Sequence, residues 1–371
     1  MTFRYALKSL YLAFRAVLLV PLRAPSLPKR ADPAMITSIL AIRIDRIGDV
    51  VVSLPALKAL KDIFPHAHLA VMVKAENAPL VKNIPFINEV ITYQDFAGAL
   101  KKLHAERFSM TVDLLMDYTL KTAMLAYLSK AKVTAGFDMG GRGGLFTIPV
   151  RQSDEKKKMA EHLLDLVAAI GARFGFDESA AGYSDPRLFI SEEDKSFADA
   201  FLKDLAARKK VVVAMHPGGN YPSQRWPQER FAQVAEAISQ KYHAGIVILG
   251  SHAERDIVDY MALLVGVETV TAIGLPLDKV AAIISSANLF IGNNSGLLHI
   301  AAALGKPTVS AMGPTDPALW WPIGVYNLVI RKGLSCSPCN KGICDSHECM
   351  KFISVEEVLR AVDILMRKIL K

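Results

Sequence analysis

The sequence has few cysteines, no long apolar run and none of the common nucleotide-binding fingerprints. All 4 cysteines lie between residues 336 and 349, so no disulfide framework spans the chain, and this usage suits a reducing, cytoplasmic compartment. The uninterrupted apolar stretch near the N-terminus, residues 16–22, is far shorter than the roughly 20 residues that cross a bilayer. A lysine-bearing GxxxxGK(S/T) loop and a GxGxxG after a strand are both missing, which argues against ATPases and dinucleotide-dependent dehydrogenases.

Acidic residues are absent from the first 30 positions, although the chain as a whole has a net charge of +8. The basic residues of this segment are Arg4, Lys8, Arg15, Arg23, Lys29 and Arg30. The rest of the chain is therefore close to neutral, at about +2. A nucleic-acid-binding protein spreads its basic residues over a docking face, so we expect no nucleic-acid partner.

The N-terminal segment, residues 1–35, repeats apolar residues at helical spacing and ends in a proline-rich linker. An amphipathic helix lying in the plane of an anionic membrane fits this pattern. An unstructured or mis-started N-terminus fits it as well. A signal peptide fits less well, because Arg15 interrupts the apolar region and no clear cleavage site follows.

From residue 38 onward, apolar runs alternate with helical patterns, which is typical of parallel α/β architecture. At 371 residues, the chain is long enough for two such domains. The pattern predicts Rossmann-like domains over residues 36–185 and 186–352. A final helix over residues 353–371 begins with the capping box Ser354-Val355-Glu356-Glu357.

Ligands of open α/β sheets bind beyond the carboxyl ends of the strands, and Asp49 follows the first predicted strand directly. Gly48 permits a tight turn there. A carboxylate at this place can accept a proton from a sugar hydroxyl as a general base. An ordinary helix-capping aspartate has the same pattern and is common.

Three loops of the second half are candidates for binding a nucleotide. Gly218 and Gly219 follow a strand, so their backbone N–H groups can approach a phosphate, and Arg225 adds a forked cation. Glu254 follows the next strand, where an acid often binds ribose hydroxyls, although a solvated helix-start glutamate is equally compatible. The residues of the third loop are Asn294, Ser295 and Gly296, with His299 one helical turn later; the free N–H groups of this helix start would bind a diphosphate.

Together these loops resemble glycosyltransferase family 9, the ADP-heptose:lipopolysaccharide heptosyltransferases. The matching stretches are residues 42–55, 216–227 and 292–307, followed by Met312-Gly313-Pro314-Thr315. The resemblance covers roughly residues 38–370. It implies the GT-B fold, in which two Rossmann-like domains face each other across a cleft, with the acceptor on the first domain and the nucleotide-sugar on the second.

The resemblance also implies an inverting, metal-independent transfer to a lipid A–core acceptor at the inner membrane face. Asp49 would be the base, and the glycine loop and Ser295-Gly296 would hold the diphosphate. Glu254 would bind the ribose, and His299 would lie on the donor's sugar side. Two positions depart from the family pattern: Gln224 replaces a usual lysine and Asn294 replaces a frequent aspartate.

The cysteines are spaced as in a zinc knuckle: Cys336, Cys339, Cys344 and Cys349. Four thiols at this spacing suit a tetrahedral structural zinc, while buried free thiols are the alternative.

From the resemblance we expect a glycosyltransferase with no catalytic cofactor. Two alternatives are a GT-B-like sugar-nucleotide epimerase and a catalytically silent, membrane-bound scaffold of the same fold.

Overall fold

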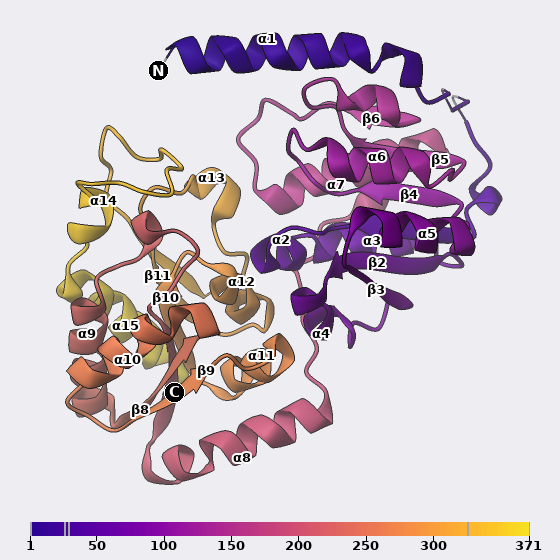
Figure 1. Cartoon of the computed structure of the whole chain (residues 1–371). Coiled ribbons are helices and arrows are strands. Elements are labelled where there is room, and N and C mark those ends of the chain that lie inside the picture. The colour runs from indigo at the N-terminus through magenta and orange to yellow at the C-terminus, as the bar shows by residue number, and fades with distance from the viewer. Residues whose placement is uncertain (1, 26, 29, 325, 371) are drawn as a thin grey trace. The chain divides into compact units, whose positions relative to one another are not determined.

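The computed structural model describes residues 2–25, 27–28, 30–324 and 326–370, and side chains from residue 10 onward except that of Glu178. The side chains of Arg4 and Lys8, and the whole of Lys29, therefore lie outside the described residues. The chain divides into two compact units that meet between Ser184 and Asp185. Each unit is an α/β structure built on one sheet (Figure 1).

Unit 1 contains a six-stranded sheet in the order β3-β2-β1-β4-β5-β6, and all of its pairings are parallel. The strands are β1 (Ser38–Ile42), β2 (His68–Lys74), β3 (Glu89–Tyr93), β4 (Met110–Asp113), β5 (Val133–Phe137) and β6 (Ile148–Val150). The helices are α1 (Thr2–Leu18), α2 (Ile47–Val52), α3 (Leu54–Ile63), α4 (Ala78–Val81), α5 (Phe96–Glu106), α6 (Leu120–Leu128) and α7 (Met159–Arg173). Short 3-10 turns cover Val20–Leu22, Pro33–Met35, Ala75–Asn77, Arg142–Leu145 and Glu178–Ala181.

Unit 2 repeats this topology, with the order β12-β11-β10-β7-β8-β9 and parallel pairing throughout. The strands are β7 (Val211–His216), β8 (Ala244–Gly250), β9 (Thr269–Ile273), β10 (Leu289–Asn293), β11 (Thr308–Ala311) and β12 (Asn327–Ile330). The helices are α8 (Glu192–Arg208), α9 (Gln228–Tyr242), α10 (Arg255–Leu264), α11 (Leu277–Ser286), α12 (Gly296–Ala303), α13 (Pro317–Trp320), α14 (Glu348–Lys351) and α15 (Val355–Ile369). Pro222–Gln224 and His252–Glu254 form 3-10 turns.

Counted along its own unit, each sheet has the strand order 3-2-1-4-5-6, which is the Rossmann order. The central strands are buried along their whole length, as β7 and β8 show. Strands covered by helices on both faces are continuously apolar, and the runs predicted from the sequence coincide with them. The expected α/β class with two Rossmann-like domains is confirmed.

The core of unit 2 joins the sheet to α9 and to the C-terminal helix. Trp226 is 1% exposed, its ring lies 5.0 Å from that of Phe231, and its Nε1 donates to Ile353 O at 3.0 Å. The buried face of α15 includes Val358, Val362 and Leu365. Burying such side chains contributes roughly 1.5–3 kcal/mol each, so α15 is part of the unit's core.

Two local features bear on the loops of unit 1. Residues 47–63 form two helices, α2 and α3, that meet at Ser53, because Pro55 has no N–H to donate to the preceding turn. Asp49 lies within the first turn of α2. The glycine-rich stretch Gly140–Gly144 contains a 3-10 turn in which Arg142 is fully buried.

The N-terminal helix α1 contacts the rest of unit 1 through one side. Arg15 is 7% exposed; its Nε donates to Gly140 O at 2.9 Å and its Nη1 to Tyr118 O at 2.7 Å. A Cβ on Gly141 would lie 2.5 Å from Ala16 Cβ, so the glycine permits close packing of this helix. The predicted helix is confirmed over Thr2–Leu18. No helix in the described part of the chain is long and apolar enough to cross a membrane.

Candidate functional site

The loops after β7 and β10 lie side by side at the point where the strand order of unit 2 reverses. The two strands pair directly, with His216 opposite Gly292. Ligands of open α/β sheets bind at this switch point, beyond the carboxyl ends of the strands. The structure therefore brings together the two glycine-containing loops, residues 217–219 and 294–296, that the sequence marked as candidates.

Asn293 ties these two loops together, although sequence reasoning did not single it out. Its side chain is fully buried. The amide nitrogen donates to Pro217 O at 2.9 Å and Gly218 O at 2.8 Å, and the amide oxygen accepts from Trp226 N at 2.9 Å. One side chain thus fixes the backbone of the glycine loop and the start of the Trp226-Pro227 element.

Glu254 closes the glycine loop from the side of β8. Its Oε1 accepts the N–H of Gly219 at 2.7 Å, and its Oε2 accepts the N–H of Ser251 at 2.9 Å. His216 Nε2 lies 3.4 Å from Oε1. Burial acts to raise the pKa of Glu254, but the hydrogen bonds and charge of His216 and the donors of Ser251 outweigh it, so the pKa lies far below its usual range. The expected ribose ligand is thus an anchored carboxylate that already accepts several hydrogen bonds.

The remaining ring nitrogen of His216 reaches the third loop. His216 Nδ1 lies 3.0 Å from Ser295 Oγ, and Ser295 precedes α12 without capping that helix through its side chain. The first turn of α12 therefore begins at the switch point, with Leu298 N donating to Ser295 O at 3.2 Å. A helix N-terminus of this kind favours an anion.

The two positions that depart from the family pattern differ in their surroundings. Gln224 Nε2 donates to Thr315 Oγ1 at 3.0 Å, in the loop that follows β11. Asn294 is 8% exposed, and its backbone N–H donates to Ala311 O at 3.2 Å. The neighbouring Arg225 uses its Nε to bind Gly219 O at 2.8 Å, which holds the guanidinium beside the glycine loop.

His299 is 5% exposed and lies in α12, and its ring is 6.1 Å from that of Trp320 in an edge-on arrangement. Burial lowers the pKa of His299 to about 4. The imidazole is therefore neutral near pH 7, so it can donate or accept a hydrogen bond without adding charge.

The equivalent switch point of unit 1 is built from charged side chains. Arg43, directly after β1, is 1% exposed. Its Nη1 lies 3.2 Å from Asp45 Oδ2 and donates to Leu114 O at 2.5 Å, while its Nη2 lies 3.4 Å from Asp49 Oδ1. One buried guanidinium therefore holds two carboxylates. One belongs to Asp49, the predicted base, and the other to Asp45, for which the sequence alone indicated no role.

A second buried ion pair lies after β4, the neighbour of β1. Arg142 and Asp113 are both fully buried and bonded to each other. Arg142 Nη1 also reaches Asp117 Oδ1 at 3.2 Å. Burial raises the pKa of Asp113, with the charge of Arg142 opposing it. Because a buried charge without a partner is costly, this pair holds the Gly140–Gly144 turn against the carboxyl end of β4.

The cysteine segment, residues 336–349, packs on the donor-loop side of unit 2. Ser223 Oγ donates to Lys341 O at 2.5 Å, and His347 Nε2 lies 2.9 Å from Ser223 O. Cys339 N donates to Pro314 O at 3.0 Å. The segment therefore supports both the turn before Arg225 and the loop that receives Gln224.

The four cysteines are free thiols with different surroundings: Cys336 is exposed, Cys339 and Cys344 are intermediate, and Cys349 is buried. Burial raises the pKa of Cys349, and the neighbouring thiols Cys339, Cys336 and Cys344 raise it further. No three His, Cys, Asp or Glu side chains are gathered as a metal site within the described residues.

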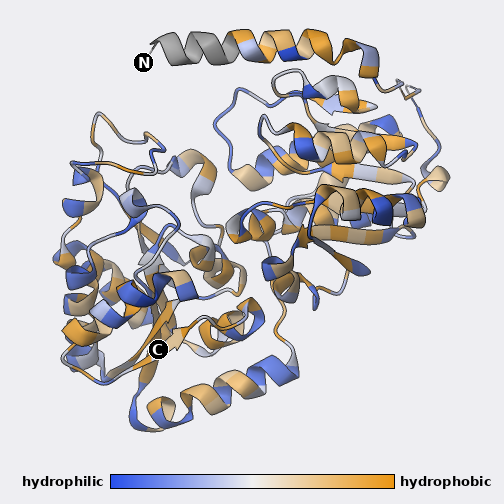
Figure 2. Cartoon of the chain, in the orientation of Figure 1, coloured by the Kyte–Doolittle hydropathy of each residue, from blue (hydrophilic) through white to orange (hydrophobic). Residues whose placement is uncertain are grey.

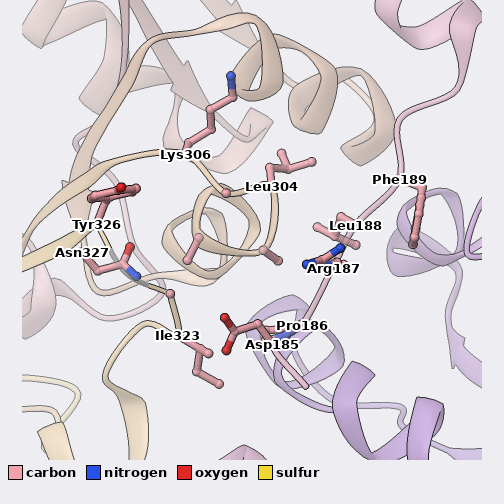
Figure 3. A pocket seen from close by; sticks show the side chains of 14 residues that line it. Asp185, Pro186, Arg187, Leu188, Phe189, Leu304, Lys306, Ile323, Tyr326 and Asn327 are labelled. Carbon is pink, nitrogen blue, oxygen red and sulfur yellow. The ribbon is translucent and has the colours of Figure 1, made fainter. Parts of the chain in front are cut away.

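A pocket of about 410 Å³ lies elsewhere in unit 2, lined by residues 185–189, 302–306, 323–324 and 326–327. Asp185 and Arg187 lie on one side of it, and Tyr326 and Asn327 on the other (Figure 3). The lining segments lead into β11 and β12, so the pocket is at the amino ends of strands. Nucleotides of Rossmann-like sheets bind at the opposite ends.

Two Rossmann-like units, one with a phosphate-type cradle at its switch point and one with a carboxylate there, define a glycosyltransferase of the GT-B fold. The model of the family "Glycosyltransferase family 9 (heptosyltransferase)" matches residues 98–349. The chain belongs to this family.

Relatives and solved structures agree with this assignment. The chain is 23% identical over 346 residues to lipopolysaccharide heptosyltransferase 2 of Escherichia coli K12, a match that covers 88% of this chain and 98% of the relative. It is similar to the structure of E. coli ADP-heptose LPS heptosyltransferase II, with a TM-score of 0.75, 23% identity and coverage of 89% and 99%. A family 9 glycosyltransferase from Veillonella parvula gives a TM-score of 0.77 at 22% identity, covering 90% and 97%.

These findings confirm the predicted glycosyltransferase class and do not favour the epimerase or scaffold alternatives. Sequence reasoning missed Arg43, Asp45, His216 and Asn293 as members of the two switch points. All four lie within the three stretches that resemble the family, so a search for polar residues at or immediately after the ends of buried strands would have found them.

Proposed function

We propose that the chain transfers a heptose from ADP-heptose to a lipid A–core acceptor, with inversion at the anomeric carbon. The observation that carries this proposal is the cradle of unit 2, where Asn293, Glu254 and His216 hold two loops with their backbone N–H groups beside a helix start. Such a cradle suits a diphosphate, and the similar E. coli enzyme is an ADP-heptose lipopolysaccharide heptosyltransferase, which supplies the donor and the class of acceptor.

Asp49 is the proposed general base. Its carboxylate takes the proton of the attacking acceptor hydroxyl, while that oxygen forms a bond to the anomeric carbon. The bond between this carbon and the diphosphate oxygen breaks, and ADP leaves with the electron pair. The first-turn N–H groups of α12, the glycine loop and Arg225 stabilise the charge that develops on the leaving diphosphate, in the place a metal ion occupies in other transferases.

The other donor contacts follow from the same pattern. Ser295 and Gly296 bind the diphosphate together with Gly218 and with Gly219, whose N–H exchanges its Glu254 partner for a phosphate oxygen. His299 lies on the sugar side as a neutral hydrogen-bonding group. Glu254 binds the ribose through the carboxylate lone pairs that do not already accept hydrogen bonds from within the protein. Gln224 and Asn294 border the same loops without adding net charge.

The decisive experiment is a turnover screen across ADP-heptose and ADP-, UDP-, GDP- and dTDP-hexoses with a lipid A–core acceptor. We expect ADP-heptose to give a glycosylated acceptor and free ADP in equal amounts. Isomerised sugar nucleotide without transfer would identify an epimerase. Preference for another nucleotide-sugar would reject the proposed donor.

We also propose that α1 holds the enzyme on the inner face of the cytoplasmic membrane. Large apolar residues of α1 are exposed, and Figure 2 shows hydrophobic residues along the coloured part of this helix. The exposed fractions of Leu10, Phe14, Val17 and Leu18 are 70%, 60%, 67% and 59%. Apolar side chains on a basic helix suit an anionic lipid surface, where a lipid-linked acceptor also lies.

A structural zinc at Cys336, Cys339, Cys344 and Cys349 is the remaining proposal. Its support is the electrostatic proximity of the other thiols to Cys349 and the contacts of this segment to both donor loops. Zinc binds four thiolates tetrahedrally, so metal binding would bring these four side chains closer together than the described residues hold them. Metal analysis of protein purified without chelator should give about one zinc per chain, and full reaction of all four thiols with a thiol reagent would contradict it.

A further inference from the structure

The pairing of Arg43 with two carboxylates raises a question about the proposed base. A carboxylate bound to a guanidinium is a weak proton acceptor, because the positive charge favours its ionised form. Asp49 receives contacts from Arg43 at two points: Nη2 to Oδ1 at 3.4 Å and Nε to the backbone O at 3.0 Å. With Arg43 as its only charged neighbour, Asp49 would be poorly suited to remove a proton from a sugar hydroxyl.

Asp45 occupies the other amino group of the same guanidinium. Its Oδ2 lies 3.2 Å from Arg43 Nη1, and its Oδ1 is buried without a hydrogen-bond partner in the described part of the chain. The backbone oxygen of Asp45 accepts from Asn77 Nδ2 at 3.3 Å, which fixes the residue beside the end of β2. A helix cap accepts a hydrogen bond from a backbone N–H, and a surface carboxylate accepts hydrogen bonds from water. Neither role explains a buried carboxylate oxygen that accepts no hydrogen bond among the described residues.

We propose that Asp45 is a positioning residue that sets the strength of Asp49 as a base, through the guanidinium that both share. This inference rests on the proposed function. With Asp45 ionised, one positive charge is divided between two carboxylates, and Asp49 retains its affinity for the acceptor's proton. When Asp49 takes that proton, the Asp45 carboxylate leaves Arg43 with a counter-charge, so no unpaired cation is created in the buried site.

The charged groups around Asp45 are consistent with a pair that holds one proton. Burial raises the pKa of Asp45 to about 7; Arg43 opposes this shift, and Asp49 and Asp117 add to it. Asp117, from the loop after β4, is itself paired with Arg142. Transfer activity should therefore rise as Asp45 loses its proton near pH 7.

The test compares turnover against pH for wild type, Asp45→Asn, Asp45→Glu and Asp49→Asn. The control is Asp62→Asn, which removes an exposed carboxylate that pairs with Lys58 on α3. In Asp45→Asn we expect maximal turnover to fall by about tenfold, the KM for ADP-heptose to stay within about twofold, and the acid limb to move to lower pH. The glutamate should restore part of the rate, and the control should match wild type.

Two results would overturn the inference. A uniform loss in Asp45→Asn with an unchanged pH profile would mean that Asp45 is only structural. A larger loss than in Asp49→Asn, with Asp49→Asn still active, would mean that Asp45 is itself the base.

A second measurement does not depend on turnover, so it separates this inference from the proposed function. Because the folded-state pKa of Asp45 exceeds the unfolded value of 3.8, the folded protein binds more protons between about pH 4 and 7, and its stability falls as pH rises through that window. Unfolding midpoints of wild type should therefore drop relative to Asp45→Asn across this range. Parallel curves would exclude the shared proton, whereas the expected drop without transfer to any acceptor would reject only the proposed function.

Discussion

The two units have the same strand order but opposite chemistry at their switch points. In unit 1, the strand ends carry Arg43, Asp45 and Asp49, which are charges held by one another. In unit 2, the equivalent loops carry glycines and the neutral amide of Asn293, with a single carboxylate already engaged by the loop itself. The first arrangement offers carboxylates to a proton and the second offers a helix start and a glycine loop to an anion, so under the proposed function one topology would supply both halves of a transfer reaction.

The sharpest way to break this comparison is to neutralise the carboxylate of unit 1. Asp49→Asn keeps the shape of the side chain but removes its proton-accepting ability, so we expect turnover to fall by roughly a hundredfold or more. Donor affinity should remain nearly unchanged, since the cradle lies in unit 2. Steady-state kinetics and donor titration measure the two effects, and a parallel loss of stability and donor binding would indicate a structural cap only.

The matching test in unit 2 is Asn293→Ala. It removes three hydrogen bonds and leaves the buried N–H of Trp226 without its acceptor, which should lower stability by about 2–4 kcal/mol. Donor affinity should fall by roughly tenfold or more, because the glycine loop loses its fixed position.

Asn288→Ala is the control for this variant. Asn288 Oδ1 accepts from Val212 N at 2.8 Å, at the start of the strands and away from the loops. We expect it to lower stability without changing donor binding, as measured by calorimetry on both variants. Equal losses of affinity in the two would show that Asn293 acts through stability alone.

A finer test concerns the two positions of the cradle that differ from the family pattern. Restoring one charge alone, by Gln224→Lys or Asn294→Asp, places an uncompensated charge in a partly desolvated site. The double variant should bind ADP-heptose more tightly than either single one, by roughly 1.5–3 kcal/mol for each charge-assisted bond regained. A double-mutant cycle measures this coupling, and additive effects would show that the two positions do not share the site.

The loops that follow the strands could be predicted from the sequence, whereas the contacts between residues far apart in the chain could not. The loops containing Asp49, Gly218-Gly219 and Ser295-Gly296 were found because each follows a continuous apolar strand. The role of Asn293 depends on the pairing of β10 with β7, whose residues are more than 70 positions apart in the chain. The burial of Arg142 similarly depends on a packing partner, Asp113, that no local pattern specifies, whereas the break at Ser53 follows from the nearby Pro55.

The smallest expected effect concerns the segment outside both switch points. Deleting residues 1–30 removes the exposed apolar side of α1 and six basic residues, so binding to vesicles with anionic lipid should weaken and become insensitive to salt. Turnover on a soluble acceptor fragment should stay within a few-fold of wild type, because Asp49 and the donor loops are unchanged.

The variant Arg15→Ala tests the same segment more finely. It releases α1 from Gly140 O and Tyr118 O but leaves the exposed apolar residues of the helix in place. This variant should still sediment with vesicles yet use a membrane-embedded acceptor less well, because the helix no longer holds unit 1 at the lipid surface. Unchanged sedimentation after the deletion would reject the membrane role, and unchanged use of the embedded acceptor by Arg15→Ala would limit α1 to a tether.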